Sequence, residues 1–118
     1  VVDTAITLHK ELGSGLLETV YEVILSRKLE RHKLIIQRQV TIPIDYDGVK
    51  FEEAFRADII VENKVILELK SVESVTKAHK KQLLTYLRLS GMKLGFLLNF
   101  GEAFMKDGIT RIVNGLEE

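Results

Sequence analysis

The segment from Arg56 to Lys70, RADIIVENKVILELK, constrains the fold most, because it contains two short apolar runs separated by three polar residues. The runs Ile59-Ile60-Val61 and Val65-Ile66-Leu67 are rich in β-branched side chains, which favour strands. The polar residues 62–64 between them are typical of a turn. We therefore predict that the two runs pair as an antiparallel hairpin.

The length of this turn decides where the charged residues of the hairpin point. A three-residue turn pairs Val61 with Val65, and counting outward then brings Asp58 opposite Glu68. Lys70 shares the face of Glu68, because side chains two apart on a strand lie on the same face. A two-residue turn would send Asp58 to the other face, since a shift of one residue inverts every side chain. A shared site for the three charges therefore requires the three-residue turn.

The three charged residues have the chemistry of a site for a divalent cation. Two carboxylates on neighbouring strands are ligands that a hard cation prefers, and a lysine beside the ion can orient or activate a water molecule. These groups suffice for phosphodiester hydrolysis, because a bound ion lowers the pKa of water and stabilises charge on the phosphate. The alternative is an exposed salt bridge between strand ends, worth ~0–1 kcal/mol. Ile60 and Ile66 favour the functional interpretation, because they place the charges at the rim of a buried face.

Composition limits the classes of function. The chain has 118 residues, of which 46% are hydrophobic, and this predicts one domain over residues 1–118. The 17 basic and 17 acidic residues cancel, so contact with nucleic acid requires a local basic patch. The absence of cysteine excludes thiol catalysis, zinc–thiolate sites and disulfides, and it makes a cytoplasmic location the default expectation. No apolar run approaches the ~20 residues that span a bilayer, so we expect no membrane association.

Apolar periodicity and turn signals predict the other elements. Helical spacing predicts a helix over residues 2–12, a second from the cap residue Ser14 to about His32, and a third over about 76–90 that ends at Gly91. Alternating or continuous apolar patterns predict strands over residues 35–46, 51–61, 65–71, 94–100 and, as an edge strand, 108–113. The order α-α-β-β-β-α-β, with or without a final strand, is typical of an α/β sandwich with a mixed sheet.

Three separated polar motifs follow one another along these elements. They are Gly15-Leu-Leu-Glu18-Thr-Val-Tyr21, then Asp58 with Glu68-Leu69-Lys70, and then Gln82 with Tyr86. In this order they resemble the motifs of the GxxExxY protein family within the PD-(D/E)XK nuclease superfamily, and the match runs nearly from end to end. The residue before Asp58 is Ala57, where the superfamily name has a proline that is not a ligand.

The resemblance implies a restriction-endonuclease-like core, with a mixed sheet flanked by helices. Our leading hypothesis for its function is a metal-dependent nuclease that hydrolyses phosphodiester bonds of DNA. Beside the Leu69 carbonyl, which our own hypothesis adds as a ligand, the resemblance implies that Asp58 and Glu68 bind Mg²⁺ or Mn²⁺. It also implies that Lys70 holds the attacking water and that Glu18 reaches the ion, directly or through water. The alternative for Glu18 is a first-turn acidic residue that complements the helix dipole.

Residues of the third predicted helix and of the hairpin are candidates for substrate contact. Gln82 and Tyr86 are four residues apart and share a helix face, so they can contact a phosphate, a base edge or a metal-bound water. The alternative is an ordinary polar rim beside buried leucines. Arg56 can pair with a carboxylate or contact a phosphate. Local basic character, which a solvated helix face would also produce, comes from Lys77, Lys80, Lys81 and Arg88.

Two further interpretations are compatible with the sequence. A nuclease-like domain that no longer cuts would serve as an interaction module for nucleic acid or protein, because a fold does not settle function. Binding of Mn²⁺ distinguishes the enzyme from this module. A homodimer that builds a DNA channel from two protomers is compatible with either interpretation.

Overall fold

The computed structural model describes residues 1–115, so residues 116–118, the end of the predicted domain, lie outside the described residues. The chain order agrees with the prediction, includes the final strand and adds a short 3-10 helix, η1. The elements are α1 (Val2–Leu12), α2 (Glu18–Arg31), β1 (Ile36–Tyr46), β2 (Val49–Val61), β3 (Val65–Lys70), α3 (Lys77–Ser90), β4 (Leu94–Asn99), η1 (Met105–Asp107) and β5 (Ile109–Val113).

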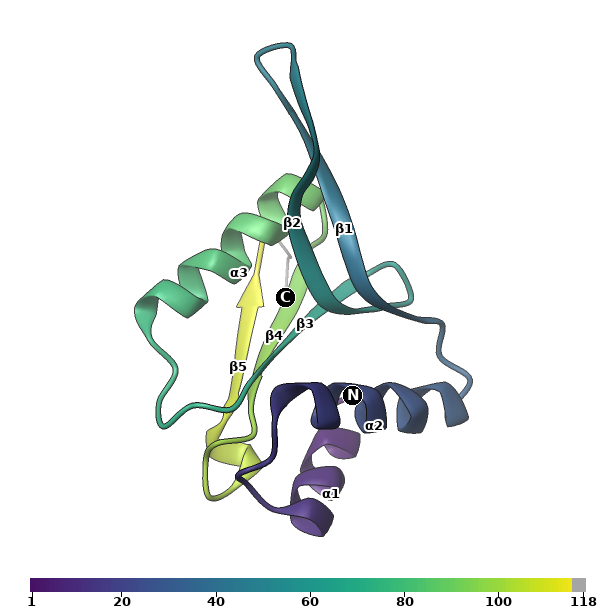
Figure 1. The fold of residues 1–118 in the computed structure, drawn as a ribbon, viewed down its shortest axis with the longest axis vertical. Coiled ribbons are helices and arrows are strands. Elements are labelled where there is room, and N and C mark those ends of the chain that lie inside the picture. Colours follow the sequence, from purple (N-terminus) through teal and green to yellow (C-terminus); the bar gives the residue numbers. More distant parts are fainter. Residues whose placement is uncertain (116–118) are drawn as a thin grey trace.

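The five strands form one mixed sheet in the order β1-β2-β3-β4-β5 (Figure 1). β3 and β4 are parallel, and the other neighbouring strands are antiparallel. Parallel neighbours need a long crossover connection, which α3 provides. β5 lies at one edge, as predicted, and β3 lies at the centre of the sheet.

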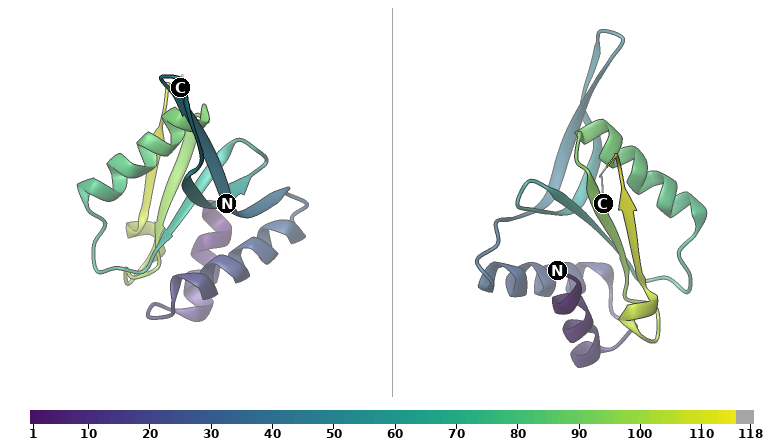
Figure 2. Two further views of the ribbon diagram at one scale, coloured as in Figure 1. Left: turned by 45° about the horizontal axis from the view of Figure 1, so that its top comes forward. Right: turned by 180° about the vertical axis from the view of Figure 1, so that it is seen from behind.

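Helices cover both faces of the sheet (Figures 1 and 2). α1 and α2 pack on one face, in a core that includes Leu25 and Ile59. α3 packs on the other face, where Leu83 belongs to the same apolar cluster as Ile60 and Ile66. The predicted burial of Ile60 and Ile66 is therefore confirmed, and the face that carries them is the one that α3 covers.

Of the two turn lengths considered, the β2–β3 hairpin has the three-residue turn that a shared site requires. Val61 pairs with Val65, and the ladder continues through Ile60–Ile66 to Ile59–Leu67, where it ends. The Lys64 N–H closes the turn by donating to the Val61 carbonyl at 3.0 Å. Extending the same register by one step brings Asp58 opposite Glu68, just beyond the last ladder pair.

β1 and β2 form a long hairpin whose tip projects beyond the rest of the molecule (Figure 1). The strands are joined by a two-residue turn, because Tyr46 pairs with Val49, and β2 therefore begins two residues earlier than predicted. Asp47 and Gly48 at this turn have positive φ angles of 52° and 76°. Two successive residues with positive φ match the right-handed twist of the flanking strands, which is why Asp-Gly is favoured here.

α2 begins at Glu18, so the prediction that Ser14 caps it was wrong, and the N-cap residue makes no side-chain hydrogen bond. The preceding loop is held instead by Tyr21, which is fully buried. Its hydroxyl donates to the Gly13 carbonyl at 2.7 Å and accepts from the Leu16 N–H at 3.1 Å. A side chain from inside the helix thus orders the loop that Ser14 was expected to order.

α3 has the boundaries that its sequence predicts. Thr76 caps its first turn through a hydrogen bond from the His79 N–H to the threonine hydroxyl, at 3.2 Å. Gly91 ends it with a φ of 76°, in the left-handed region that glycine adopts without strain. None of the helices within residues 1–115 has the length and apolarity that crossing a membrane requires.

Candidate active site

Asp58 lies where the pairing of β2 with β3 stops. The last ladder pair is Ile59–Leu67, and beyond it the Asp58 side chain takes over the contact with β3. Its Oδ2 accepts a hydrogen bond from the Leu69 N–H at 2.9 Å. This bond fixes Oδ2 and orients the Asp58 carboxylate toward β3.

Glu68 is a buried carboxyl group whose side chain is only partly bonded. The residue is 6% exposed, and its Oε1 atom is buried without a hydrogen-bond partner in the described residues. Burial raises the pKa of Glu68 from 4.5 to about 9, and the neighbouring charge of Asp58 adds to this effect. The ammonium of Lys70 acts in the opposite direction and lowers the pKa of Glu68. Without a cation, Glu68 is therefore protonated at neutral pH.

Leu69 and Lys70 are fixed by β4 and the residue that follows it. Leu69 is buried and lies opposite Leu98 in the parallel ladder, between the two candidate charged residues of β3. Lys70 is half-buried, and its backbone carbonyl accepts from the Phe100 N–H at 2.8 Å. The end of β3 is thus held on both sides, by Asp58 from β2 and by the neighbouring strand.

Glu18 lies at the start of α2 and is exposed. Its Oε1 accepts from the Ser71 N–H at 3.2 Å, and the Ser71 hydroxyl donates to the Leu16 carbonyl at 3.1 Å. These two bonds join the beginning of α2 to the chain just after Lys70. Within residues 1–115, however, no three acidic, histidine or cysteine side chains gather in a cluster able to hold a metal ion. The structure therefore does not bring Glu18 into one cluster with Asp58 and Glu68.

Tyr86 is the α3 residue whose pKa is affected by Asp58 and Glu68. Its ring stacks on Phe55 of β2, with ring centroids 4.0 Å apart and planes inclined by 9°. Burial raises the pKa of Tyr86, and the charges of Glu68 and Asp58 raise it further. Tyr86 is thus coupled electrostatically to both carboxyl groups, on the face of the sheet that α3 covers.

The remaining candidates for substrate contact lie at the surface. Gln82 is exposed one turn before Tyr86, and Arg56 is exposed on β2, where it pairs with Thr41. Within residues 1–115, Arg56 makes no ion pair with Asp58. The basic residues of α3 are all exposed: Lys77, Lys80, Lys81 and Arg88.

The donor set at the end of β3 fits a hard divalent cation. Asp58 and Glu68 supply carboxylate oxygens, and the buried Oε1 of Glu68 is an acceptor with no donor assigned to it. Mg²⁺ is commonly bound through one or two carboxylates while it keeps several waters. Two carboxylates in contact are therefore sufficient, even though residues 1–115 offer no third acidic group within the same cluster.

Glu22, to which the sequence analysis gave no role, lies one turn after Glu18 and is 5% exposed. Arg38 of β1 donates to its Oε2 through Nε at 3.1 Å and Nη2 at 2.7 Å. The amide of Gln39 donates to its Oε1. The spacing of Glu18 and Glu22 shows that they share a side of the helix, but it does not reveal which strand residues that side meets.

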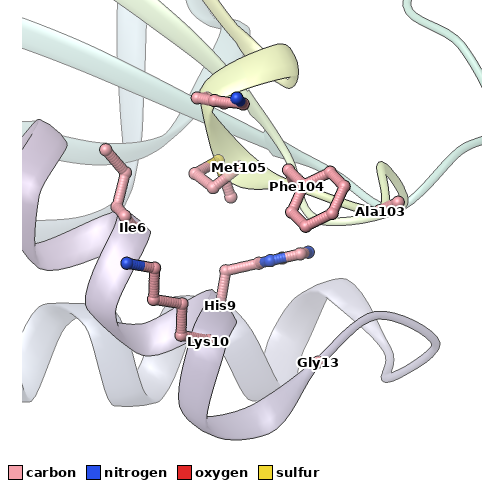
Figure 3. A pocket seen from close by; sticks show the side chains of 8 residues that line it. Ile6, His9, Lys10, Gly13, Ala103, Phe104 and Met105 are labelled. Atoms are coloured by element: carbon pink, nitrogen blue, oxygen red, sulfur yellow. The ribbon is translucent and has the colours of Figure 1, made fainter.

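A cavity of about 590 Å³ lies elsewhere, between α1 and the segment around η1 (Figure 3). It is bordered by apolar side chains such as Met105 and by His9, whose Nε2 lies 3.3 Å from the Phe100 carbonyl. None of the candidate site residues lines it. The candidate active site is therefore defined by the carboxyl groups of β2 and β3 and not by this cavity.

A family model described as the PD-(D/E)XK nuclease superfamily matches residues 1–112. The matched range contains all the candidate residues, from Glu18 to Tyr86. It supports a nuclease-like fold, in agreement with the mixed sheet and the order of the elements. The narrower GxxExxY family is not addressed by this match. No curated protein and no solved structure gave a significant match.

Proposed function

Because this chain belongs to the PD-(D/E)XK nuclease superfamily, we propose that it is a metal-dependent nuclease that hydrolyses the phosphodiester bonds of DNA. One observation carries the proposal. Glu68 keeps a buried carboxyl oxygen without a partner, beside Asp58 and next to the end of β3 that carries Lys70. A purely structural glutamate in this position would destabilise the fold without compensation, because buried polar groups are normally hydrogen-bonded.

We assign Asp58, Glu68 and the Leu69 carbonyl as the groups that hold Mg²⁺ or Mn²⁺. A bound ion of this kind lowers the pKa of water and neutralises charge that develops on the phosphate. The Leu69 N–H orients the Asp58 carboxylate by donating to its Oδ2. Glu68 ionises when a cation is bound, because an opposite charge nearby favours the carboxylate form.

Lys70 and Glu18 complete the proposed chemistry. As an ammonium, Lys70 can only donate hydrogen bonds, so it orients a water oxygen or holds a phosphate oxygen. Glu18 holds the start of α2 against Ser71, just after the end of β3. From this exposed position, Glu18 acts on the site through water.

The substrate would lie along the exposed side of α3. Tyr86 and Gln82 of this helix and Arg56 of β2 are the side chains that we propose contact it. The exposed basic residues of α3 would follow the phosphate backbone, because contacts to phosphates dominate the affinity of proteins for DNA. These contacts do not depend on the neutral net charge of the whole chain, since the basic residues are local to one helix.

Cleavage of supercoiled plasmid and of circular single-stranded DNA tests the proposal. We expect nicking in Mn²⁺ or Mg²⁺, and none in EDTA. Lys70→Ala should slow it by roughly 10²–10³-fold, the range for the loss of one preorganised hydrogen-bond donor. Lys64→Ala is the matched control, because Lys64 is exposed in the turn that precedes β3. Equal rates for the wild type and Lys70→Ala would refute the proposal.

Calorimetric titration with Mn²⁺ tests the ion site without relying on cleavage. We expect the wild type to bind and Asp58→Asn to lose binding, because the amide oxygen of asparagine carries no charge. Asparagine can still accept from the Leu69 N–H, so the local fold should be retained. A wild type that binds no Mn²⁺ would refute the assignment of these ligands.

A further inference from the structure

Gln39 has an unusual backbone conformation for a residue in the middle of a strand. Its φ angle is 52°, in the left-handed region, where an L residue other than glycine is strained. The other non-glycine residues with positive φ in the described part of the chain lie in turns or just after a helix. They are Lys33, Asp47, Glu62 and Asn63.

The strained residue lies directly opposite Asp58. The β1–β2 ladder is formed at Arg38–Ile59 and again at Val40–Ala57, with the same register on both sides, but not at the step between them. Gln39 and Asp58 occupy that unpaired step. The left-handed residue therefore interrupts the ladder for one position without shifting the strands.

Asp58 is consequently free of ladder pairing on both sides. The β2–β3 ladder ends at Ile59, and the Asp58 carboxylate replaces a backbone group by accepting from the Leu69 N–H. An extended residue 39 would pair with the backbone at position 58 and tie β2 to β1 there. The interruption allows β2 to separate from β1 at Asp58, whose side chain must reach β3.

Glu22 holds this conformation in place. Its buried carboxylate accepts from the Gln39 amide through one oxygen and from the Arg38 guanidinium through the other. Hydrogen bonds to a charged group are among the strong ones in proteins. These hydrogen bonds offset the backbone strain at position 39. Without them, an exposed strand residue would relieve the strain by returning to extended φ and ψ angles.

We propose that Gln39 is a positioning residue: its left-handed backbone, locked by Glu22, opens the β1–β2 ladder and sets the Asp58 carboxylate toward Leu69 and Glu68. The effect on ion binding rests on the proposed function. The effect on the position of Asp58 does not, because the Leu69 N–H reports that position in the metal-free protein.

Gln39→Ala and Gln39→Gly form a matched pair, since both remove the amide that binds Glu22. Only alanine retains the strain of positive φ, so only alanine should return to an extended backbone. Gln37→Ala is the control, because Gln37 is exposed in the same strand and pairs regularly with Ile60. Amide hydrogen exchange at Leu69, followed by NMR in EDTA, measures the Asp58 contact, and calorimetry with Mn²⁺ measures the ion site.

We expect exchange at Leu69 to rise roughly tenfold in Gln39→Ala, with a similar weakening of Mn²⁺ binding, which is the size that left-handed strain implies. Gln39→Gly and Gln37→Ala should match the wild type in both measurements. The inference would be overturned if the Leu69 amide were as protected from exchange in Gln39→Ala as in the wild type. Loss of this protection in Gln39→Gly would also overturn it. If the alanine variant does not fold, the glycine variant decides the question. Failure of the wild type to bind Mn²⁺ would overturn only the proposed function, because the exchange at Leu69 is measured without metal.

Discussion

Replacing Glu68 by glutamine should stabilise the metal-free protein at neutral and alkaline pH. Glutamine has nearly the same shape and cannot ionise, whereas the folded state raises the pKa of Glu68 from 4.5 to about 9. Between these two values the folded protein retains a proton that the unfolded chain releases. The stability of the wild type therefore falls as pH rises through this interval.

The size of the effect follows from the same two values. One pKa unit corresponds to about 1.4 kcal/mol. A rise in pH from 4.5 to 7 therefore lowers the free energy of unfolding of the wild type by about 3 kcal/mol. The cost continues to grow by about 1.4 kcal/mol per pH unit until pH reaches about 9. The Gln variant has no ionisable group at position 68. Its free energy of unfolding should therefore exceed that of the wild type by an amount that grows steadily across this pH range.

Urea unfolding in EDTA, monitored by circular dichroism at several pH values between 5 and 9, measures this difference. Glu73→Gln is the control, because Glu73 is exposed in the loop after β3 and its charge stays in water. Mn²⁺ should restore stability to the wild type at alkaline pH and leave Glu68→Gln unchanged. The reasoning would be refuted if, in EDTA, the unfolding free energies of the wild type and Glu68→Gln changed with pH in the same way.

Three other substitutions test the contacts around the site. Asn99→Ala should destabilise the fold by about 3 kcal/mol in urea unfolding, because the buried Asn99 side chain satisfies both backbone groups of Val72 and the Gly101 N–H. Gly101→Ala should also cost about 3 kcal/mol, since a Cβ there would lie 2.1 Å from the Val72 carbonyl oxygen. Phe55→Leu should lower the melting temperature slightly by removing the stack on Tyr86, worth about 1 kcal/mol, and should slow DNA cleavage.

The sequence predicts the fold well where signals are local. The turn between Val61 and Val65 and the ends of α3 depend on residues adjacent in the chain, and all were predicted correctly. The same local register was sufficient to bring Asp58 and Glu68 to facing positions. Side-chain period on a strand is strict, so a correct turn length fixes the faces of all the residues that follow.

Features that depend on contacts between distant elements could not be predicted in this way. Ser14 has the composition of a cap, but the hydroxyl of the buried Tyr21 orders the loop instead. The position of Glu18 against Ser71 joins residues 53 apart in the chain. The left-handed backbone of Gln39 has no local signal, because its stabilising partner, Glu22, comes from a helix packed across the sheet.

The parallel pairing of β3 with β4 has a consequence for how the protein matures. Parallel neighbours meet only after the intervening crossover is in place, and such non-local pairing is slow to form. A nascent chain that has emerged from the ribosome only as far as Lys70 carries both carboxyl groups but lacks the strand that braces one side of β3. The proposed ion site should therefore form only after β4 (Leu94–Asn99) has been synthesised.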